Sequence, residues 1–287
     1  MQRLTALVLL CSVLTACSGG DIGQLEDPGP RTPSAERGGI PVSQGTHVMR
    51  LDQPGFRDRE YRLRVPRNFD GPLPLVLAVH GGASTAERFQ EESGFDAVAD
   101  DKGFLVAYPE GFLRSWNAGP CCGPAKVAKA DDAGFLRTLI DRLVRAGVAD
   151  PERVFVAGFS NGGGMAYRLA CEGPGRVKGI GVVSASLVIG CEPERPVSAM
   201  IVHGRKDTSV PFQGGGRRDF DDSRPYAPVS KAVTFFRKAA GIAALTSDKG
   251  CRAGKRKGIA VRFCPHGGGH VWPENAARDL WRFFAAL

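Results

Sequence analysis

The sequence has no long apolar run, and that absence excludes one class of protein. No stretch reaches the roughly 18 consecutive apolar residues that a membrane-spanning helix needs, so an integral membrane protein is not expected. The chain also has no Cys-x-x-Cys pair, which argues against a zinc site built on paired thiolates. Its 38 glycines follow no collagen period, and the sequence shows neither an internal repeat nor a second domain. These absences leave a globular chain without a fibrous or membrane-spanning part.

The composition is that of an ordinary globular protein. The chain has 287 residues, of which 43% are hydrophobic and 24% charged, and this length suits one large α/β domain with a sizeable core. The net charge is +8, and the basic residues are scattered except for a group between Lys249 and Arg262. No nucleic-acid-binding motif accompanies that group. We therefore expect a solvated basic hairpin that rests near anionic lipid, and no nucleic-acid partner.

The first residues are typical of an export signal. Arg3 precedes an apolar stretch, Leu4–Leu14, which is too short to span a bilayer. The segment Leu14–Cys17 resembles the lipobox of bacterial lipoproteins, in which cleavage precedes the cysteine and its sulfur is acylated. An ordinary small-residue cleavage site is the alternative interpretation. A lipid anchor at Cys17 would make a membrane the partner of this chain.

These features predict three parts of the chain. We expect a signal peptide over residues 1–16, an acylated cysteine with a flexible tether over residues 17–45, and the folded catalytic domain over residues 46–287. The protein is then exported to the cell envelope and held at an outer membrane or cell surface, or else secreted. No obligate protein partner is evident.

The cysteine count agrees with export. Two of the eight cysteines, Cys11 and Cys17, precede the expected domain, and the remaining six can form up to three disulfides. Local spacing favours two bridges and elimination leaves a vicinal third: Cys251–Cys264, Cys171–Cys191 and Cys121–Cys122.

Apolar runs and amphipathic segments alternate along the chain. After a half-exposed strand at Tyr61–Val65, the expected buried strands are Leu75–Val79, Phe104–Tyr108, Val154–Ala157, Ile180–Val183 and Ala199–Val202, with a further strand at Val261–Phe263. The expected helices are Phe95–Asp101, one from Asp132 to Val144, Met165–Ala170, Val229–Ala240 and Asn275–Leu287. This alternation predicts an α/β fold with a mostly parallel central sheet flanked by helices on both faces.

One strand-to-helix junction carries a nucleophile motif. The segment Gly158–Gly162 reads Gly-Phe-Ser-Asn-Gly, which matches the nucleophile elbow G-x-S-x-G, and it follows an apolar strand and precedes a helix. A Ser hydroxyl becomes a nucleophile only when a His removes its proton and a carboxylate orients that His. Ser160 is therefore the candidate nucleophile, and a Gly-rich turn with a hydrogen-bonding Ser is the structural alternative.

The acid and the base are expected after the nucleophile, in that order. His270 lies in a Gly-rich loop before the last helix, whereas His266 is better explained as a surface residue or loop brace. Asp207 follows the strand that ends at His203 and is the candidate acid; a turn-forming role is its alternative. His80 is a rival base, but it precedes the Ser and ends a different strand.

A tetrahedral oxyanion needs two backbone N–H donors. Asn161 follows the nucleophile at the start of a helix, whose dipole helps. The second donor is expected from the His80–Ala83 loop, at Gly82.

Six ordered motifs carry a family resemblance. They are His80–Gly82, Ser115–Gly119 with the following Cys121 and Cys122, Asp131–Phe135, Gly158–Gly163, His203–Phe212 and Gly269–Pro273. Together they resemble the polyhydroxybutyrate depolymerase and feruloyl esterase group of α/β-hydrolases, which is esterase D-like and related to carbohydrate-esterase family 1. The resemblance extends from about Leu73 to Pro273.

The resemblance implies a serine esterase with the α/β-hydrolase fold. It implies Ser160, Asp207 and His270 as the catalytic triad, and an acyl-enzyme formed from feruloyl, acetyl or short hydroxyalkanoate esters. It also implies that Trp116 and Trp272 contact substrate, with packing under the loop as the alternative for Trp116. Neither a metal nor an organic cofactor is implied.

One segment departs from the family pattern. Residues 214–224 read GGGRRDFDDSR, which is more highly charged than the resemblance leads us to expect. No separate polymer-binding domain is present, so soluble esters or oligomers are expected rather than crystalline polymer. A serine peptidase of the same fold and a non-catalytic binding protein on a hydrolase scaffold are the two alternatives.

Overall fold

The computed structural model describes residues 36–52, 58–120, 123–173, 175–192, 195–216 and 225–287. The predicted signal peptide, Cys17 and the vicinal pair of Cys121 and Cys122 lie outside the described residues. So does most of the charged segment 214–224.

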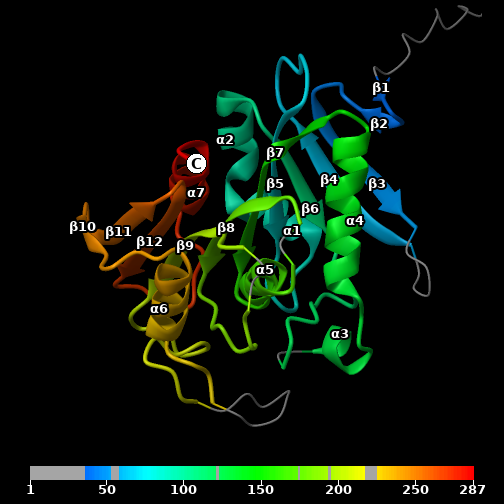
Figure 1. Cartoon of the computed structure of the whole chain (residues 1–287). Coiled ribbons are helices and arrows are strands. Elements are labelled where there is room, and N and C mark those ends of the chain that lie inside the picture. The colour runs from blue at the N-terminus through cyan, green and yellow to red at the C-terminus, as the bar shows by residue number, and fades with distance from the viewer. Residues whose placement is uncertain (1–35, 53–57, 121–122, 174, 193–194, 217–224) are drawn as a thin grey trace, which may run out of the picture. The chain divides into compact units, whose positions relative to one another are not determined.

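A ten-stranded sheet forms the centre of the domain, in the order β10-β11-β12-β9-β8-β7-β5-β6-β4-β3 (Figure 1). The strands from β12 to β6 in this order run parallel to one another: β5 (Leu73–Val79), β6 (Leu105–Pro109), β7 (Ala149–Phe159), β8 (Val177–Val183), β9 (Ser198–Gly204) and β12 (Ile259–His266). The remaining strands pair antiparallel at the two edges: β3 (Gly45–Leu51), β4 (Arg59–Val65), β10 (Thr246–Asp248) and β11 (Cys251–Arg256). The predicted mostly parallel sheet is confirmed.

Helices cover both faces of the sheet (Figure 1). One face packs against α1 (Ala86–Ser93), α2 (Phe95–Lys102) and α7 (Ala276–Ala285). The other packs against α4 (Asp132–Arg145), α5 (Asn161–Cys171) and α6 (Val229–Ala239). The short helix α3 (Pro124–Val127) lies in the connection before α4. Among the described residues, no helix combines the length and the apolar character needed to cross a bilayer.

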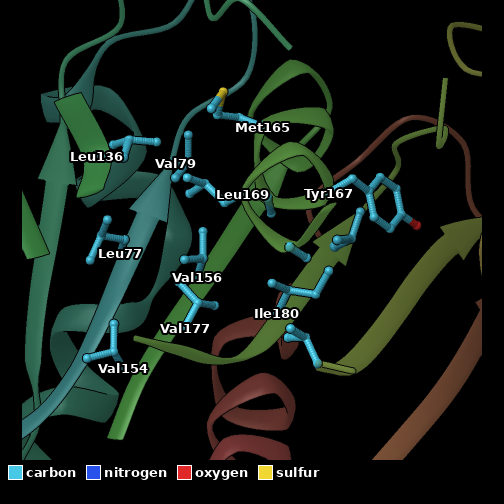
Figure 2. Packing of buried hydrophobic residues seen from close by; sticks show 14 of the residues in the cluster. Leu77, Val79, Leu136, Val154, Val156, Met165, Tyr167, Leu169, Val177 and Ile180 are labelled. Atoms are coloured by element: carbon cyan, nitrogen blue, oxygen red, sulfur yellow. The ribbon is translucent and has the colours of Figure 1, made fainter. Parts of the chain in front are cut away.

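Strand β5 shows why the central strands read as unbroken apolar runs. Leu75 and Leu77 point into the core beneath α4 and α5, whereas Val76 and Ala78 point into the core beneath α1, α2 and α7. Successive side chains of a strand face opposite sides of a sheet, so a strand covered on both sides needs apolar residues at every position. Figure 2 shows the core beneath α4 and α5, to which Leu77 of β5 and Leu169 of α5 both belong.

The N-terminal boundary of the domain differs from the prediction. Strands β1 (Glu36–Arg37) and β2 (Ile40–Pro41) form a small antiparallel hairpin inside the segment expected to be a tether. The side chain of Ile40 is fully buried in the core, and a Cβ on Gly38 would lie 2.7 Å from Cα of Ala146. The prediction that the tether extends to residue 45 was therefore wrong for this hairpin, because one apolar side chain docks it on the domain.

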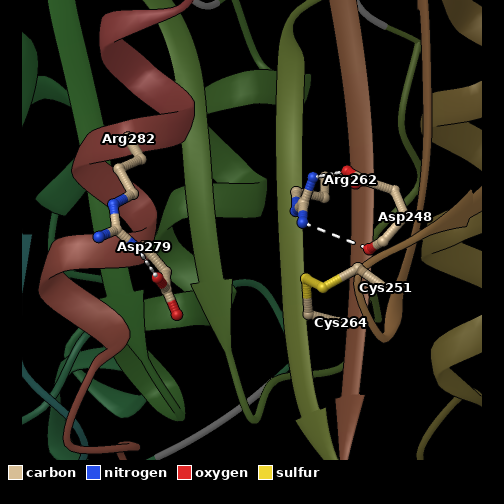
Figure 3. The surroundings of a disulfide bond; sticks show 6 residues. All are labelled: Asp248, Cys251, Arg262, Cys264, Asp279 and Arg282. Carbon is tan, nitrogen blue, oxygen red and sulfur yellow. Dashed lines mark hydrogen bonds and ion pairs between the residues drawn. A yellow bond between two sulfur atoms is a disulfide. The ribbon is translucent and has the colours of Figure 1, made fainter.

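Two of the predicted disulfides are confirmed. Cys171, at the end of α5, bridges to Cys191 with a Cα–Cα distance of 4.8 Å. Cys251 on β11 bridges to Cys264 on β12 with a Cα–Cα distance of 4.3 Å. Figure 3 shows this second bridge beside the ion pair of Arg262 with Asp248. The predicted basic hairpin is formed by β11 and β12.

Candidate active site

Ser160 lies at a sharp turn between β7 and α5. Its backbone has φ 53° and ψ −118°, a conformation that L-residues rarely adopt. A Cβ on Gly158 would lie 2.2 Å from the carbonyl oxygen of Gly162, and a Cβ on Gly162 would lie 2.2 Å from the carbonyl oxygen of Val79. No side chain fits at either glycine, so both are required for the turn. This is the geometry expected of a nucleophile elbow.

The structure brings the three predicted triad side chains together. Nε2 of His270 lies 2.9 Å from Oγ of Ser160, and Nδ1 of His270 lies 2.8 Å from Oδ2 of Asp207. The carboxylate of Asp207 is fully buried, while the side chain of His270 is 21% exposed. The three residues follow three different parallel strands, β7, β9 and β12, whose carboxyl ends meet at one edge of the sheet.

The second oxygen of Asp207 holds the carboxylate in place. Oδ1 accepts hydrogen bonds from the backbone N–H groups of Ser209 and Val210, at 3.0 and 2.8 Å. Oδ2 is thereby turned toward the Nδ1–H of His270. With the proton on Nδ1, the lone pair on Nε2 faces the hydroxyl of Ser160, which is the arrangement a general base requires.

A second histidine near the site was not given a role by the sequence. His203 is fully buried at the end of β9, and its Nε2–H donates to the carbonyl of Val210 at 2.8 Å. Burial lowers the pKa of His203, so the ring is neutral at pH 7. The sequence feature that could have indicated a role for His203 is its position at the end of a buried strand, four residues before Asp207.

Both ring nitrogens of the rival candidate His80 are hydrogen-bonded to backbone groups other than those of Ser160. Its Nδ1–H donates to the carbonyl of Gly81 at 2.7 Å, and its Nε2 accepts from the N–H of Gly111 at 3.0 Å. Burial lowers the pKa of His80 to about 4. His266 acts as a loop brace, because its Nδ1 accepts from the N–H of Gly268 at 3.1 Å.

The two candidate oxyanion donors come from neighbouring segments. Asn161 is the first residue of α5, and Gly82 lies in the loop that follows β5. A Cβ on Gly82 would lie 3.6 Å from Cβ of Asn161, so the two backbones approach closely. The positive end of the α5 dipole adds to the electrostatic potential at this point.

The two tryptophans predicted to contact substrate are both engaged in contacts within the protein. Trp116 is fully buried, and its Nε1–H donates to the carbonyl of His80 at 2.9 Å. Trp272 packs edge-on against Phe89, and its Nε1–H donates to the carbonyl of Ser93 at 3.0 Å. Both indoles are engaged in packing between loops, and neither lines the cavity at Ser160. The sequence gives proximity to the site but not the direction in which a side chain points.

A small apolar cavity adjoins the nucleophile. Its volume is about 40 Å³, and Ser160 and Asn161 form one wall. The rest of its lining consists mainly of small or apolar side chains: Ala118, Gly164, Ala185, Val188, Val210 and Tyr226. Within the described ranges, no group of three or more His, Cys, Asp or Glu side chains is placed to hold a metal ion.

Comparisons with known proteins place this geometry in a family context. The family model described as "Esterase PHB depolymerase" matches residues 61–234. The chain is 31% identical to a putative esterase, NocK, of Nocardia uniformis subsp. tsuyamanensis, over 93% of this chain and 88% of that protein. It is 28% identical to feruloyl esterase C of Emericella nidulans, over 79% of this chain and 84% of that protein. Among solved structures, an acetyl xylan esterase from Aspergillus awamori superposes with a TM-score of 0.61 at 16% identity, covering 84% of this chain and all of that one.

Proposed function

The chain belongs to the esterase PHB depolymerase family, and we propose that Ser160, His270 and Asp207 are the residues with which it hydrolyses carboxylic esters. The observation that carries the assignment is the unbroken contact from Ser160 through His270 to Asp207, at 2.9 and 2.8 Å. These distances are within the range that proton transfer between a nucleophile and its base requires.

The first half-reaction forms an acyl-enzyme. Nε2 of His270 takes the proton from Ser160, and Oγ of Ser160 attacks the ester carbonyl carbon. The carbonyl oxygen becomes an oxyanion, which the backbone N–H groups of Gly82 and Asn161 stabilise. When the tetrahedral intermediate collapses, the protonated His270 gives its proton to the departing alcohol oxygen, and the acyl group remains on Ser160.

The second half-reaction releases the acid. A water molecule gives a proton to Nε2 of His270 and attacks the acyl carbonyl, which forms a second oxyanion at the same donors. Collapse of this intermediate breaks the bond to Oγ, and His270 returns the proton to Ser160. Asp207 orients the imidazole and stabilises its cationic form in both half-reactions.

The cavity beside Ser160 supports a short acyl group. Its volume of about 40 Å³ makes it a small cavity for an acyl group. It therefore holds only a few non-hydrogen atoms beyond the carbonyl, which suits acetyl to butyryl chains. Its lining of Ala118, Gly164 and Ala185 is apolar and offers an aliphatic chain no charged partner. A feruloyl group would have to extend out of this cavity.

We propose further that the enzyme acts outside the cytoplasm, attached by a lipid at Cys17. Disulfides are typical of exported proteins, and the domain forms two. The lipobox-like segment Leu14–Cys17 supplies the acylation site. Detergent phase partition of the full chain and of the Cys17→Ala variant tests this: we expect only the former to enter the detergent phase. Recovery of both proteins in the aqueous phase would remove the anchor from the proposal.

Two measurements on the purified protein test the catalytic proposal. A fluorophosphonate probe should label the full chain at Ser160, and a Ser160→Ala variant should remain unlabelled. An ester panel should rank p-nitrophenyl acetate and butyrate above methyl ferulate in kcat/KM. Absence of labelling would favour a binding protein on a hydrolase scaffold, and preferred turnover of a peptide substrate would favour a peptidase. A preference for methyl ferulate would instead overturn the assignment of the cavity.

A further inference from the structure

The two proposed oxyanion donors lie on separate segments, and one buried residue contacts both segments. The backbone N–H of Trp116 donates to Oδ1 of Asn161 at 2.7 Å, and Nδ2 of Asn161 donates to the carbonyl of Trp116 at 3.0 Å. The indole Nε1–H of Trp116 donates to the carbonyl of His80, two residues before Gly82, at 2.9 Å. Trp116 therefore links the start of α5 to the loop after β5.

The loop that carries Gly82 is tied down on both sides of that residue. On one side, the carbonyl of His80 accepts from the indole of Trp116. On the other side, the backbone N–H of Ala83 donates to the carbonyl of Arg114 at 2.8 Å. Both bonds come from the same neighbouring segment, residues 114–116, so the position of Gly82 depends on the position of that segment.

Burial makes these contacts costly to lose. The side chains of Trp116 and His80 are fully buried, and Asn161 is 6% exposed. A buried polar group left without a partner lowers the stability of the fold by roughly 1–3 kcal/mol. Each of these hydrogen bonds therefore favours the observed arrangement of the two segments over one in which the bond is broken. The amide of Asn161 donates to and accepts from a single peptide, which also fixes its rotation.

A buried ion pair holds the other side of the same segment. One oxygen of Asp132 lies 2.9 Å from the guanidinium of Arg59, and its second oxygen accepts the backbone N–H of Asn117 at 2.6 Å. The guanidinium of Arg59 stacks over the ring of Phe135 at 4.3 Å and lies 5.8 Å from the ring of Trp116. The segment is thus fixed to the start of α4 and to β4.

We propose that Trp116 is a positioning residue for the oxyanion hole, and that it sets the separation of the Gly82 and Asn161 backbone amides. This proposal rests on the proposed function, because it assumes that these amides stabilise the oxyanion. Trp116 itself does not touch the substrate. Its loss should therefore weaken binding of the transition state and leave binding of the ground-state ester nearly unchanged.

The Trp116→Phe variant of the full chain tests the proposal. Phenylalanine keeps an aromatic ring but removes the Nε1–H that donates to His80, together with part of the indole's volume. We expect kcat for p-nitrophenyl butyrate to fall roughly 10- to 100-fold with KM changed less than about threefold. The affinity for a trifluoromethyl ketone, which forms a tetrahedral adduct with Ser160, should fall by a similar factor.

Trp281→Phe is the matched control. Trp281 also is buried, and it stacks on Phe104 at 3.8 Å on the opposite face of the sheet. The same chemical change there should leave kcat and the inhibitor affinity unchanged. An equal fall of kcat in both variants would mean that loss of packing, and not loss of the Nε1–H, is responsible, and it would overturn the proposal.

A second variant keeps the test independent of how well Trp116→Phe folds. Asn161→Asp retains the acceptor for the N–H of Trp116 but replaces the donor to its carbonyl with a carboxylate oxygen. It should show the same fall in kcat at nearly constant KM. If both variants keep wild-type kcat, or change KM alone, the positioning role is refuted. If wild-type protein does not hydrolyse esters at all, the proposed function fails instead, so the two failures are distinguishable.

Discussion

Nε2 of His203 lies 3.3 Å from Oδ2 of Asp207, so the buried carboxylate faces a second imidazole besides His270. His203 is neutral at pH 7, because burial lowers its pKa. The partial positive charge of its N–H supports the carboxylate without competing for the proton.

Removal of the nucleophile should abolish turnover without unfolding the protein. The Ser160→Ala variant is expected to lower kcat for p-nitrophenyl butyrate by roughly 10⁴- to 10⁶-fold. The thermal unfolding temperature should be nearly unchanged, because the substitution removes the hydrogen bond between Ser160 and the partly exposed His270. Near-wild-type turnover in this variant would be incompatible with Ser160 as the nucleophile.

Replacement of His203 should impair catalysis through Asp207. His203→Phe keeps an aromatic ring but leaves the buried carbonyl of Val210 without its donor, which is expected to destabilise the fold by roughly 1–3 kcal/mol. We expect kcat to fall about tenfold, because Asp207 is then held less firmly in its orientation toward His270. His203→Gln can restore an N–H at the same depth and should recover most of both losses. Equal kcat values in the wild type and His203→Phe would show that the contact with Asp207 is incidental.

The stability of the domain should fall in mild acid because of His80. Its pKa in the folded state is about 4, below the ordinary 6.5, so between these values the unfolded chain binds more protons than the folded one. The free energy of unfolding therefore decreases as pH drops from 6.5 toward 4. His80 alone should account for ~2 kcal/mol between pH 7 and pH 5.

Urea unfolding of the wild type and of His80→Gln, at both pH values, isolates this contribution. His203, whose pKa is also lowered, is present in both proteins and cancels in the comparison. The variant should lose less stability on acidification than the wild type. An identical pH dependence would mean that His80 does not remain neutral in the folded state.

The Cys251–Cys264 bridge should stabilise the edge of the sheet. The two residues are 13 positions apart, and closing a loop of about this length contributes roughly 3 kcal/mol. The Cys251→Ser, Cys264→Ser double variant should lose about that much stability in urea unfolding. Thiol titration of the denatured wild type provides the control, because neither residue should react before reduction.

A single added methyl group should shift acyl preference. Gly164 lines the cavity beside Ser160, and a Cβ there would lie 3.1 Å from Cβ of Ala118. Gly164→Ala should therefore reduce kcat/KM for p-nitrophenyl butyrate roughly tenfold more than for the acetate. If the ratio of the two substrates does not change, the acyl group lies outside this cavity.

Much of the fold could be predicted from the sequence because the signal was local. Strand β5 is covered on both faces, so its apolar run was unbroken, and α4 shows its amphipathic period and its cap at Asp131. Strand β3 was missed because its edge position leaves polar and exposed side chains such as Arg50 along it. Ile40 was missed because one buried residue in a polar stretch gives no periodic pattern.

The candidate site was predictable in its residues but not in its supports. Ser160, Asp207 and His270 follow from a motif and from the order of the chain, both of which are visible in one dimension. The roles of Trp116 and Asp132 depend on contacts between segments far apart in the sequence, such as that of Asp132 with Arg59. Only the folded chain shows which backbone groups these side chains bind.

The close approach of Gly158 and Gly162 allows the residues that line the cavity to vary while the position of Ser160 stays fixed. The position of Ser160 depends on close contacts between backbone atoms at Gly158 and Gly162. Substitutions at neighbouring positions leave these contacts intact as long as both residues remain glycine. The walls around the acyl chain can therefore drift, residue by residue, without displacing the reacting oxygen. A scaffold of this design can acquire a new ester preference while its chemistry stays fixed.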